Sequence, residues 1–266
     1  MRIARFTTGD DPRFGAVGED QDGQTVLAVL EGDPLYKPVQ LTGEKLALDE
    51  VRLLAPVIPR SKVIGVGRNY VDHAAELGND VPEEPLLFLK PNTAVIGPDD
   101  PIVMFPASDE IHHEAELAVV IGRIAKDVPR ERVPEVILGY TCANDVTARD
   151  LQRKDGQWAR AKGFDSSCPL GPWIETDLDV ADLSVRCVVN GEARQVGRTS
   201  QMVFDVPTLV SYISSAFTLL PGDVILTGTP AGVGPIQAGD HVVVSIEGIG
   251  LLSNQVVAPD DDAPSP

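Results

Sequence analysis

The segment IHHEAELAVVIG, residues 111–122, places two histidines and two glutamates directly before an apolar run. If this segment is one β-strand, its side chains alternate between two faces, so that His112, Glu114 and Glu116 share a face. Two carboxylates that are half-buried side by side repel each other. A divalent cation would remove this repulsion, and ligands that are all oxygen favour Mg²⁺, Mn²⁺ or Ca²⁺ over zinc.

The spacing of the two glutamates is a weak signal by itself. An isolated Glu-x-Glu pair more often lies on a solvated strand face, and the segment lacks the HExxH spacing of zinc proteases. Asp145 strengthens the metal interpretation because it ends the strand-like run YTCAND at 140–145, and strand ends are frequent functional positions. Three carboxylates would leave about three positions of an octahedral ion open, which suits the carboxylate and keto oxygens of a 2-oxo acid.

Strand patterns dominate the elements that must position these residues. The pair Asn190-Gly191 predicts a tight hairpin turn. The apolar spacing of VPTLVSYISSAF predicts a helix over 206–217, which Asp205 caps and the Leu-Pro-Gly-Asp sequence at 220–223 ends. β-Branched or apolar runs bounded by Gly, Pro and Asp predict strands at 62–67, 85–90, 116–122, 140–145, 184–190, 223–228 and 241–246.

The chain is expected to divide into three parts. Residues 1–58 carry short strand patterns and many charges and predict a small N-terminal module. The Pro-rich segment APVIPRSK at 55–62 marks a boundary to a larger domain over 59–258, which is mostly β with short helices (α+β). The acidic, Pro-rich residues 259–266 predict a disordered tail without a function.

Composition narrows the possible partners and compartments. The formal net charge of −18 argues against a nucleic-acid partner, because phosphates would be repelled. No apolar run approaches the ~18–20 residues of a membrane span, and the N-terminus lacks the apolar stretch of a signal peptide. We therefore expect a cytoplasmic protein. Its three cysteines are widely spaced, so they indicate reduced thiols rather than a zinc site or a disulfide framework.

Six sequence blocks, in order, carry a resemblance to a known family. They are GVGRNYVDHAAELG, FLKPNTAVIGP, HHEAELAVVIG, YTCANDVTARDLQ, RAKGFDSSCPLGPWI and ILTGTPAGVGPI. Together they closely resemble the fumarylacetoacetate hydrolase family, from about Val63 to Val257. The resemblance implies the family's C-terminal-domain fold, a mixed β-roll with short helices, here with a small N-terminal α+β module. It also implies a homodimer and a small-molecule substrate, a 2-oxo acid or an enol diacid.

The metal triad of this family falls on Glu114, Glu116 and Asp145, the residues that the strand argument had already selected. The resemblance implies Mg²⁺ or Mn²⁺ as the cofactor, with Ca²⁺ a further option in a crystal. His113 is expected to do no more than support the metal shell.

The resemblance also implies residues that contact the substrate. Lys162 matches the family lysine that would bind a developing enolate, although an isolated lysine here could equally be solvated. Arg149 could meet a substrate carboxylate, or it could be a surface ion-pair partner of Asp145 or Asp150. The substrate contacts implied by the family blocks are Arg68, Asn69, Arg149, Gln152 and Thr229.

His73 and Glu76 match a His-Glu pair on a mobile segment of the family's hydrolytic and decarboxylating members. Their spacing places them on one face of a short helix, where a carboxylate would orient a histidine that moves protons near neutral pH. The flanking Gly67 and Gly78 would let this segment move as a lid. The alternative is an ordinary pair on a solvated helix.

The resemblance is strongest to bacterial proteins assigned as 2-hydroxyhepta-2,4-diene-1,7-dioate isomerases of aromatic catabolism. Acylpyruvate hydrolases and oxaloacetate decarboxylases share the same motifs, and the His73–Glu76 pair leaves both reactions open. A non-catalytic metal-binding or ligand-binding module is a further alternative, which predicts a metal site without turnover. A purely structural role of the carboxylates would predict no metal dependence at all.

Overall fold

The computed structural model describes residues 1–259, so of the predicted acidic tail only Pro259 falls within it. The first strands are β1 (Arg2–Thr7), β2 (Arg13–Glu19), β3 (Thr25–Leu30), β4 (Leu41–Ala47), β5 (Arg52–Leu54), β6 (Val63–Gly67), β7 (Leu86–Lys90), β8 (Val95–Ile96), β9 (Ile102–Val103) and β10 (Ile111–His113). The later strands are β11 (Ala115–Ile121), β12 (Ile137–Asn144), β13 (Thr147–Ala148), β14 (Cys168–Glu175), β15 (Ser184–Val189), β16 (Glu192–Arg198), β17 (Val224–Leu226), β18 (Gly234–Pro235), β19 (His241–Ile246) and β20 (Gly250–Val257).

The helices are short. The α-helices are α1 (Val71–Glu76), α2 (Arg149–Asp155), α3 (Ala159–Lys162) and α4 (Val206–Ala216). The 3₁₀ helices are η1 (Leu48–Glu50), η2 (Asn92–Ala94), η3 (Arg130–Glu135) and η4 (Thr199–Gln201). The predicted class, mostly β with short helices, is confirmed. None of the helices in residues 1–259 is long and apolar enough to cross a membrane.

Three sheets make up the fold. The largest has the order β4-β3-β2-β1-β14-β12-β11-β17-β6-β7, with β5 paired to β1 and β8 paired to β14. A second sheet has the order β16-β15-β19-β20-β9, and a small one has the order β13-β10-β18. Most pairs are antiparallel, whereas β6 runs parallel to β17, so the large sheet is mixed.

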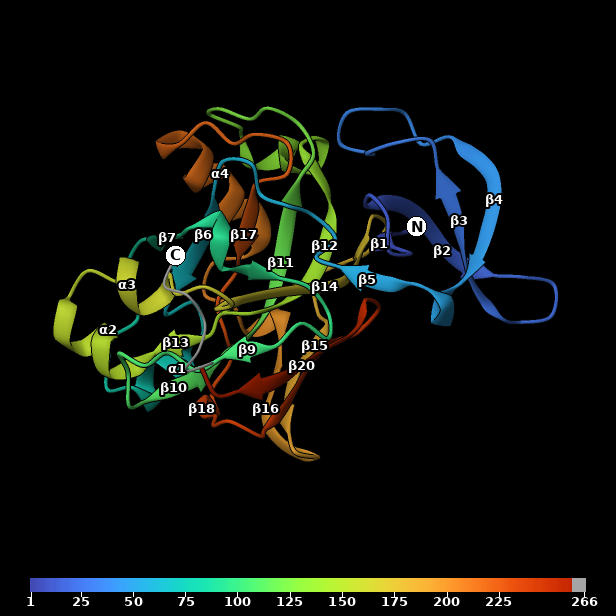
Figure 1. Ribbon diagram of the computed structural model, residues 1–266. Coiled ribbons are helices and arrows are strands. Elements are labelled where there is room, and N and C mark those ends of the chain that lie inside the picture. Colours follow the sequence, from blue (N-terminus) through green and yellow to red (C-terminus); the bar gives the residue numbers. More distant parts are fainter. Residues whose placement is uncertain (260–266) are drawn as a thin grey trace.

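The N-terminal strands form a distinct lobe that shares the large sheet. They lie on the opposite side of the molecule from α1, α2 and α3 (Figure 1). The lobe has its own apolar cluster of Ala4, Phe6, Leu27 and Val29. β1 joins it to the larger body by pairing with β14, where Ile3 lies opposite Ile174.

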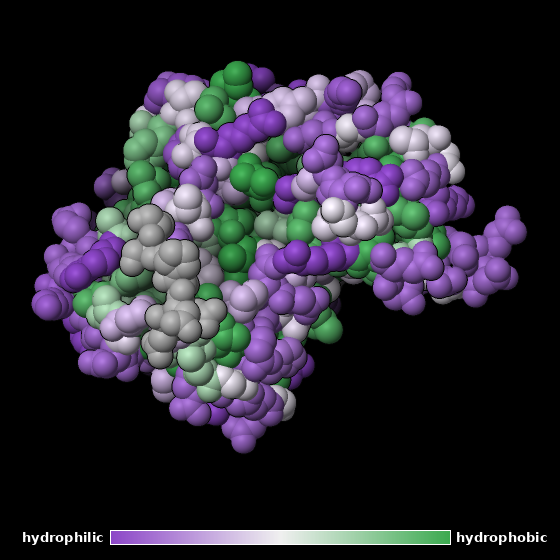
Figure 2. Space-filling view, in the orientation of Figure 1, coloured by the Kyte–Doolittle hydropathy of each residue, from purple (hydrophilic) through white to green (hydrophobic). Residues whose placement is uncertain are grey.

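The main core lies between the two larger sheets. Alternating apolar residues of β11, such as Leu117 and Val119, pack there with Val185 and Val244 of the second sheet. Hydrophilic side chains cover most of the face in Figure 2, and a band of hydrophobic ones runs down the middle of the larger body. Burial of this apolar surface is the main force that holds the sheets together.

The local sequence signals correspond to observed elements. The predicted helix is α4, and its cap is confirmed because the side chain of Asp205 accepts a hydrogen bond from the backbone N–H of Thr208. Asn190 and Gly191 connect β15 and β16 with φ values of 52° and 83°, as the predicted tight hairpin turn requires. Each predicted strand overlaps an observed one.

The assumption that 111–122 forms one continuous strand does not hold, although the predicted strand at 116–122 corresponds to β11. The chain leaves the small sheet after β10 and enters the large sheet with β11, so Glu114 lies at the change between them. Its backbone N–H donates to Oδ1 of Asn144 over 2.9 Å, and its carbonyl accepts from the N–H of Asp145. These bonds satisfy the backbone at the break and attach Glu114 to the end of β12.

Candidate active site

Three buried carboxylates converge where β11 and β12 meet. Ala115 lies opposite Asn144 and Glu116 opposite Ala143 in this antiparallel pair, which brings Glu114 and Glu116 against Asp145. Their ligand oxygens all lie within 4.8 Å of one another, and all three residues are buried. The structure thus brings together the carboxylates that the sequence predicted as metal ligands.

Three cations contact two of these carboxylates, Glu114 and Asp145. The ammonium Nζ of Lys162 lies 2.8 Å from Oε2 of Glu114 and 2.6 Å from Oδ2 of Asp145. Nζ of Lys90 lies 2.7 Å from the other oxygen of Asp145, Oδ1. Arg149 forms an ion pair with Oε1 of Glu114. Lys162 is therefore not a solvated lysine, and Arg149 is a buried rather than a surface partner.

The pKa values of Glu114 and Glu116 are shifted in opposite directions by their surroundings. Burial would raise the pKa of Glu114, but the charges of Lys162 and Arg149 outweigh it and hold that pKa well below the ordinary value. Burial raises the pKa of Glu116, and the neighbouring Asp145 and Glu114 raise it further. Glu116 is thus the carboxylate for which the negative charge is most unfavourable in the absence of a further cation.

The donor set fits a divalent cation. Glu116 accepts a hydrogen bond from the backbone N–H of Gly228 over 2.7 Å, and it has no ion pair with any of the residues that the structure describes. A buried carboxylate that faces two others is stabilised by a positive ion between them. Oxygen-only ligands suit Mg²⁺ or Mn²⁺, so Glu114, Glu116 and Asp145 could hold such an ion.

Arg149 and Gln152 lie on the same face of α2, as their spacing predicts. The guanidinium of Arg149 donates from Nη1 to Oε1 of Gln152 over 2.7 Å, and both residues line the cavity. Nε of Arg149 is buried and has no hydrogen-bond partner among the described residues. This arginine therefore retains donor capacity next to the carboxylates.

His73 and Glu76 lie on α1 at the cavity rim. Nδ1 of His73 is 3.4 Å from Oε2 of Glu76, and burial lowers the pKa of His73 below its ordinary value. The carboxylate of Glu76 also accepts the backbone N–H of Gly232, at 3.0 and 3.2 Å. The pair thus joins α1 to the GTPAGVG loop, and the imidazole is neutral at pH 7.

The proposed hinges of this segment differ in their surroundings. Gly78 has a φ of +68° with open space around it, whereas Gly67 ends β6 and lies against the ring of Trp158. Gly78 therefore has the left-handed conformation that favours glycine, and Gly67 is explained by close packing.

Gln195 is a site residue that the sequence analysis missed. Its Nε2 donates to Oγ1 of Thr229 over 2.7 Å and to the carbonyl of Pro230 over 2.8 Å. Its Oε1 lies 2.9 Å from the N–H of Ala115 and 3.0 Å from Nδ1 of His113. Gln195 orients Thr229 and His113 together, and His113 contacts this amide rather than a carboxylate.

The segment GRNY, residues 67–70, contributes Arg68 to the cavity and Asn69 to the core. Arg68 lines the cavity and adopts a φ of 57°. Asn69 does not line the cavity, because its side chain bonds to the backbone of Phe204 and Thr227. Both amide hydrogens of the buried Asn69 side chain are therefore used within the protein, and none faces the cavity where a substrate would bind.

Two further polar residues were missed. Lys90 is fully buried, and although it lies in the quoted block FLKPNTAVIGP, only its contact with Asp145 reveals its role. The hydroxyl of Tyr70 is buried without a partner in residues 1–259, and burial together with the charge of Glu116 raises the pKa of Tyr70. No motif in the sequence separates these residues from ordinary core positions.

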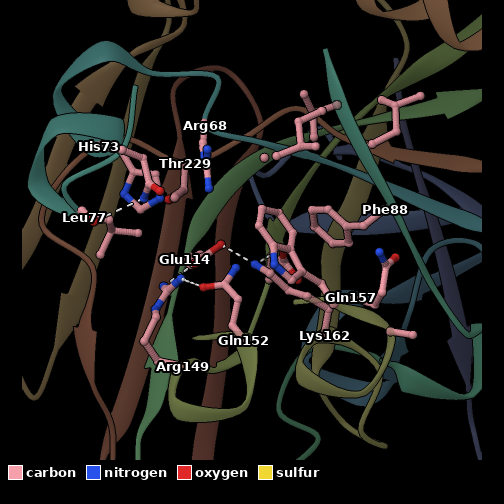
Figure 3. A pocket seen from close by; sticks show the side chains of 18 of the residues that line it. Arg68, His73, Leu77, Phe88, Glu114, Arg149, Gln152, Gln157, Lys162 and Thr229 are labelled. Carbon is pink, nitrogen blue, oxygen red and sulfur yellow. Dashed lines mark hydrogen bonds and ion pairs between the residues drawn. The ribbon is translucent and has the colours of Figure 1, made fainter. Parts of the chain in front are cut away.

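One cavity of about 790 Å³ is lined by the three carboxylates and by Arg68, His73, Arg149, Gln152, Lys162 and Thr229. Figure 3 shows Glu114, Arg149, Gln152 and Lys162 converging at its centre, with His73 on one side and Phe88 on the other. Cavities of this size are typical of small-molecule sites. The arrangement could hold a cation, bind an anionic ligand and move a proton.

Comparison with known proteins defines the class. The family described as fumarylacetoacetate (FAA) hydrolase C-terminal matches residues 62–257, and a family described as Rv2993c-like, N-terminal matches residues 1–56. The chain therefore belongs to the fumarylacetoacetate hydrolase family and carries an Rv2993c-like N-terminal domain.

Among similar sequences, one carries no activity in its name and another is named as an oxaloacetate tautomerase. Protein Rv2993c of Mycobacterium tuberculosis is 53% identical over 264 residues, which cover 97% of this chain and 98% of that protein. The mitochondrial oxaloacetate tautomerase FAHD2A of Homo sapiens is 46% identical over 224 residues, covering 80% of this chain and 71% of that protein.

Solved structures match over most of the chain. A 5-carboxymethyl-2-hydroxymuconate delta-isomerase from Mycobacterium smegmatis is 52% identical with a TM-score of 0.90, covering 97% of this chain and 100% of its own. A 2-hydroxyhepta-2,4-diene-1,7-dioate isomerase from Mycobacterium marinum is 48% identical with a TM-score of 0.90, covering 98% and 100%. A fumarylpyruvate hydrolase from Pseudomonas aeruginosa, in complex with Mn²⁺ and pyruvate, is 36% identical with a TM-score of 0.71, covering 75% and 90%.

Proposed function

We propose that this protein is a divalent-metal-dependent isomerase of 2-oxo or 2-hydroxy-enol diacids, most like the 2-hydroxyhepta-2,4-diene-1,7-dioate isomerases of aromatic catabolism. One observation supports this most strongly. Glu114, Glu116 and Asp145 lie within 4.8 Å of one another at the wall of a cavity that also contains Lys162 and His73. The names of the two similar mycobacterial structures agree with this assignment.

The proposed cofactor is Mg²⁺ or Mn²⁺ on the three carboxylates. When bound, the cation would act as a Lewis acid on the C2 oxygen of the substrate, worth several kcal/mol as negative charge develops there. The Mn²⁺ and pyruvate in the similar fumarylpyruvate hydrolase are consistent with this choice.

The residues around the carboxylates supply recognition and proton transfer. Arg149 and Gln152 offer donors to the carboxylate next to the C2 oxygen. The guanidinium of Arg68, which lines the same cavity, would meet the distal carboxylate of a diacid. Lys162, a buried cation whose pKa the neighbouring Asp145 and Glu114 raise, stabilises the enolate charge.

Isomerisation moves a proton without gain or loss of atoms. The neutral imidazole of His73, oriented by Glu76, accepts a proton from one end of the enol system and returns it to a carbon further along. Because its pKa is lowered, the imidazole is unprotonated at pH 7 and able to act as a base. Such general acid–base catalysis contributes about 10²–10⁴-fold.

Hydrolytic C–C cleavage of an acylpyruvate is the second candidate function. The observation that favours it is the contact between His73 and Glu76, since a histidine held by a carboxylate can also activate water. Decarboxylation of oxaloacetate would use the same enolate and is tested alongside it.

The experiment is an assay of three substrates, each with Mn²⁺ or Mg²⁺ and again with excess EDTA. A 2-hydroxydienedioate, an acylpyruvate and oxaloacetate represent the candidate reactions. Isomerisation that disappears with EDTA would support the proposal, whereas cleavage of the acylpyruvate alone would favour the hydrolase. Inertness toward all three, with Mn²⁺ still bound, would favour a non-catalytic binding module.

We further propose that the protein is a homodimer. The family resemblance supports this assignment, and light scattering coupled to size-exclusion chromatography tests it. A monomeric mass at micromolar concentration would contradict it.

A further inference from the structure

One wall of the cavity is apolar and is not part of the hydrophobic core. Leu86 and Phe88 of β7, Leu77 after α1 and Trp158 between α2 and α3 all line it. These four side chains are half-buried, and none belongs to or packs against the three apolar clusters of the fold. Leu87, on the opposite face of β7, also lines the cavity but packs against the main core. The wall therefore has apolar surface available to a ligand.

Two aromatic rings form the centre of this wall. Phe88 and Trp158 make an edge-to-face contact with ring centroids 5.6 Å apart. Strand β6 makes room for them with glycines, because a Cβ on Gly65 would lie 2.1 Å from Phe88 and one on Gly67 would lie 2.7 Å from Trp158. Any larger residue at either position would displace a ring, so the sequence of β6 shapes this wall.

Strand β7 connects the apolar wall to the carboxylate cluster. Leu86, Phe88 and Lys90 share one face, spaced by about 7 Å along the strand. Lys90 contacts Asp145, and Nζ of Lys162 lies 5.0 Å from the centroid of the Phe88 ring. A ligand that extends from the carboxylates along this face of β7 would meet Phe88 and then Leu86.

We propose that Phe88 and Trp158 form a subsite for the carbon chain of the substrate, and that this subsite selects long enol acids over oxaloacetate. The apolar carbons of a long chain, saturated or conjugated, can pack against aromatic rings. Oxaloacetate, with four carbons and a charge at each end, would instead bring a carboxylate toward an apolar wall, which is unfavourable. The inference rests on the proposed function and adds the substrate class.

The test compares a ligand that fills only the polar end with one that also carries a chain. Oxalate and 2-oxoheptanedioate are titrated by calorimetry into the Mn²⁺-loaded protein and into its Trp158→Leu and Phe88→Leu variants. We expect each variant to weaken 2-oxoheptanedioate about tenfold while oxalate affinity stays within about twofold. Folding of both variants is checked by their melting temperatures.

Fluorescence supplies an independent measurement. The chain has two tryptophans, and Trp173 lies outside the cavity, where its indole bonds to the carbonyl of Ile249. In a Trp173→Phe variant the emission comes from Trp158 alone. We expect 2-oxoheptanedioate to change this emission and oxalate to leave it nearly unchanged.

The outcomes separate the inference from the proposed function. If oxalate binds and both variants bind 2-oxoheptanedioate as tightly as the wild type, the subsite is refuted while the metal-dependent site stands. Equal weakening of both ligands would also refute the subsite, since it indicates general damage. If neither ligand binds the Mn²⁺-loaded wild type, the proposed function fails and the subsite fails with it.

Discussion

The ammonium of Lys90 lies 2.7 Å from Oδ1 of Asp145, and both side chains are buried. Lys90 does not line the cavity, whereas Lys162, which contacts Oδ2 of the same carboxylate, does. The two lysines thus approach Asp145 from different sides. Lys90 fixes the carboxylate from within the protein, and Lys162 is the cation that a ligand can meet.

Replacing Lys90 should affect stability. In a Lys90→Met variant, one oxygen of a buried carboxylate loses its partner, and breaking such a pair costs about 3–5 kcal/mol. Because Lys162 still contacts Asp145, we expect about 3 kcal/mol, measured as the free energy of unfolding in urea. The matched control is Lys126→Met at an exposed lysine, which should change stability by less than about 0.5 kcal/mol. Equal effects of the two substitutions would contradict the structural role of Lys90.

Replacing Glu116 should have opposite effects on metal binding and on stability. A Glu116→Gln variant replaces a negatively charged metal ligand by a neutral amide. Its affinity for Mn²⁺, measured by calorimetry, should therefore fall more than about a hundredfold. Without metal, the neutral amide removes the repulsion from Glu114 and Asp145 that raises the pKa of Glu116. The melting temperature in EDTA should therefore rise. The exposed Glu83→Gln serves as a control, and a lower melting temperature of the Glu116 variant in EDTA would argue against this repulsion.

The pH dependence should follow His73. Burial is the main cause that lowers its pKa, so the imidazole keeps its neutral, basic form as the pH falls through the ordinary histidine value of about 6.5. We expect the acidic limb of kcat/KM to lie below that pH, and turnover of His73→Gln to fall about 10²–10⁴-fold without this limb. An acidic limb that persists unchanged in the variant would assign the titration to another group.

The same pKa shift has a consequence for stability. The unfolded chain takes up a proton at His73 near its ordinary pKa, whereas the folded chain does so only at lower pH. The contribution to stability is therefore complete above the unfolded pKa and is lost as the pH falls toward the folded one. Unfolding in urea at successive pH values should show a smaller loss below about pH 6.5 for His73→Gln than for the wild type.

Replacing Gln195 tests the connection between Thr229 and His113. A Gln195→Leu variant leaves a buried backbone N–H and a buried carbonyl without their partners, which costs about 1–3 kcal/mol per group. We expect a lower free energy of unfolding and weaker binding of oxalate to the Mn²⁺-loaded protein. Unchanged oxalate affinity in a folded variant would show that the orientation of Thr229 does not matter for binding.

Local sequence patterns predicted seven of the fifteen strands that the structure describes in the larger body, β6 to β20. The β-branched runs, the Asn190-Gly191 turn and the capped helix at 206–217 all depend on neighbouring residues, and each has its observed counterpart. Strand β14 gave no clear signal because Pro169 and Pro172 interrupt its pattern. The pairing of β1 with β14 joins residues more than 170 positions apart, which no local pattern specifies.

The candidate site was predictable where spacing carries the chemistry. Glu114 and Glu116 are two residues apart and Asp145 directly follows a strand, so local pattern singled out all three, and the family resemblance grouped them as one triad. The contacts of Lys90 and Gln195 could not be predicted, because their partners lie 55 and 34 positions away in the chain. The break in the strand at Glu114 was missed for the same reason, since it depends on bonds to Asn144 and Asp145.

The three buried cations around the carboxylates also bear on the order in which the molecule is assembled. Lys90, Lys162 and Arg149 are carried by the polypeptide itself, so the acidic cluster has counter-charges before any ion arrives. A chain of this kind can complete its folding first and take up its ion afterwards, unlike small zinc domains that are unfolded without metal. Chelation should therefore produce an inactive protein that keeps its native far-ultraviolet spectrum and recovers on addition of Mn²⁺.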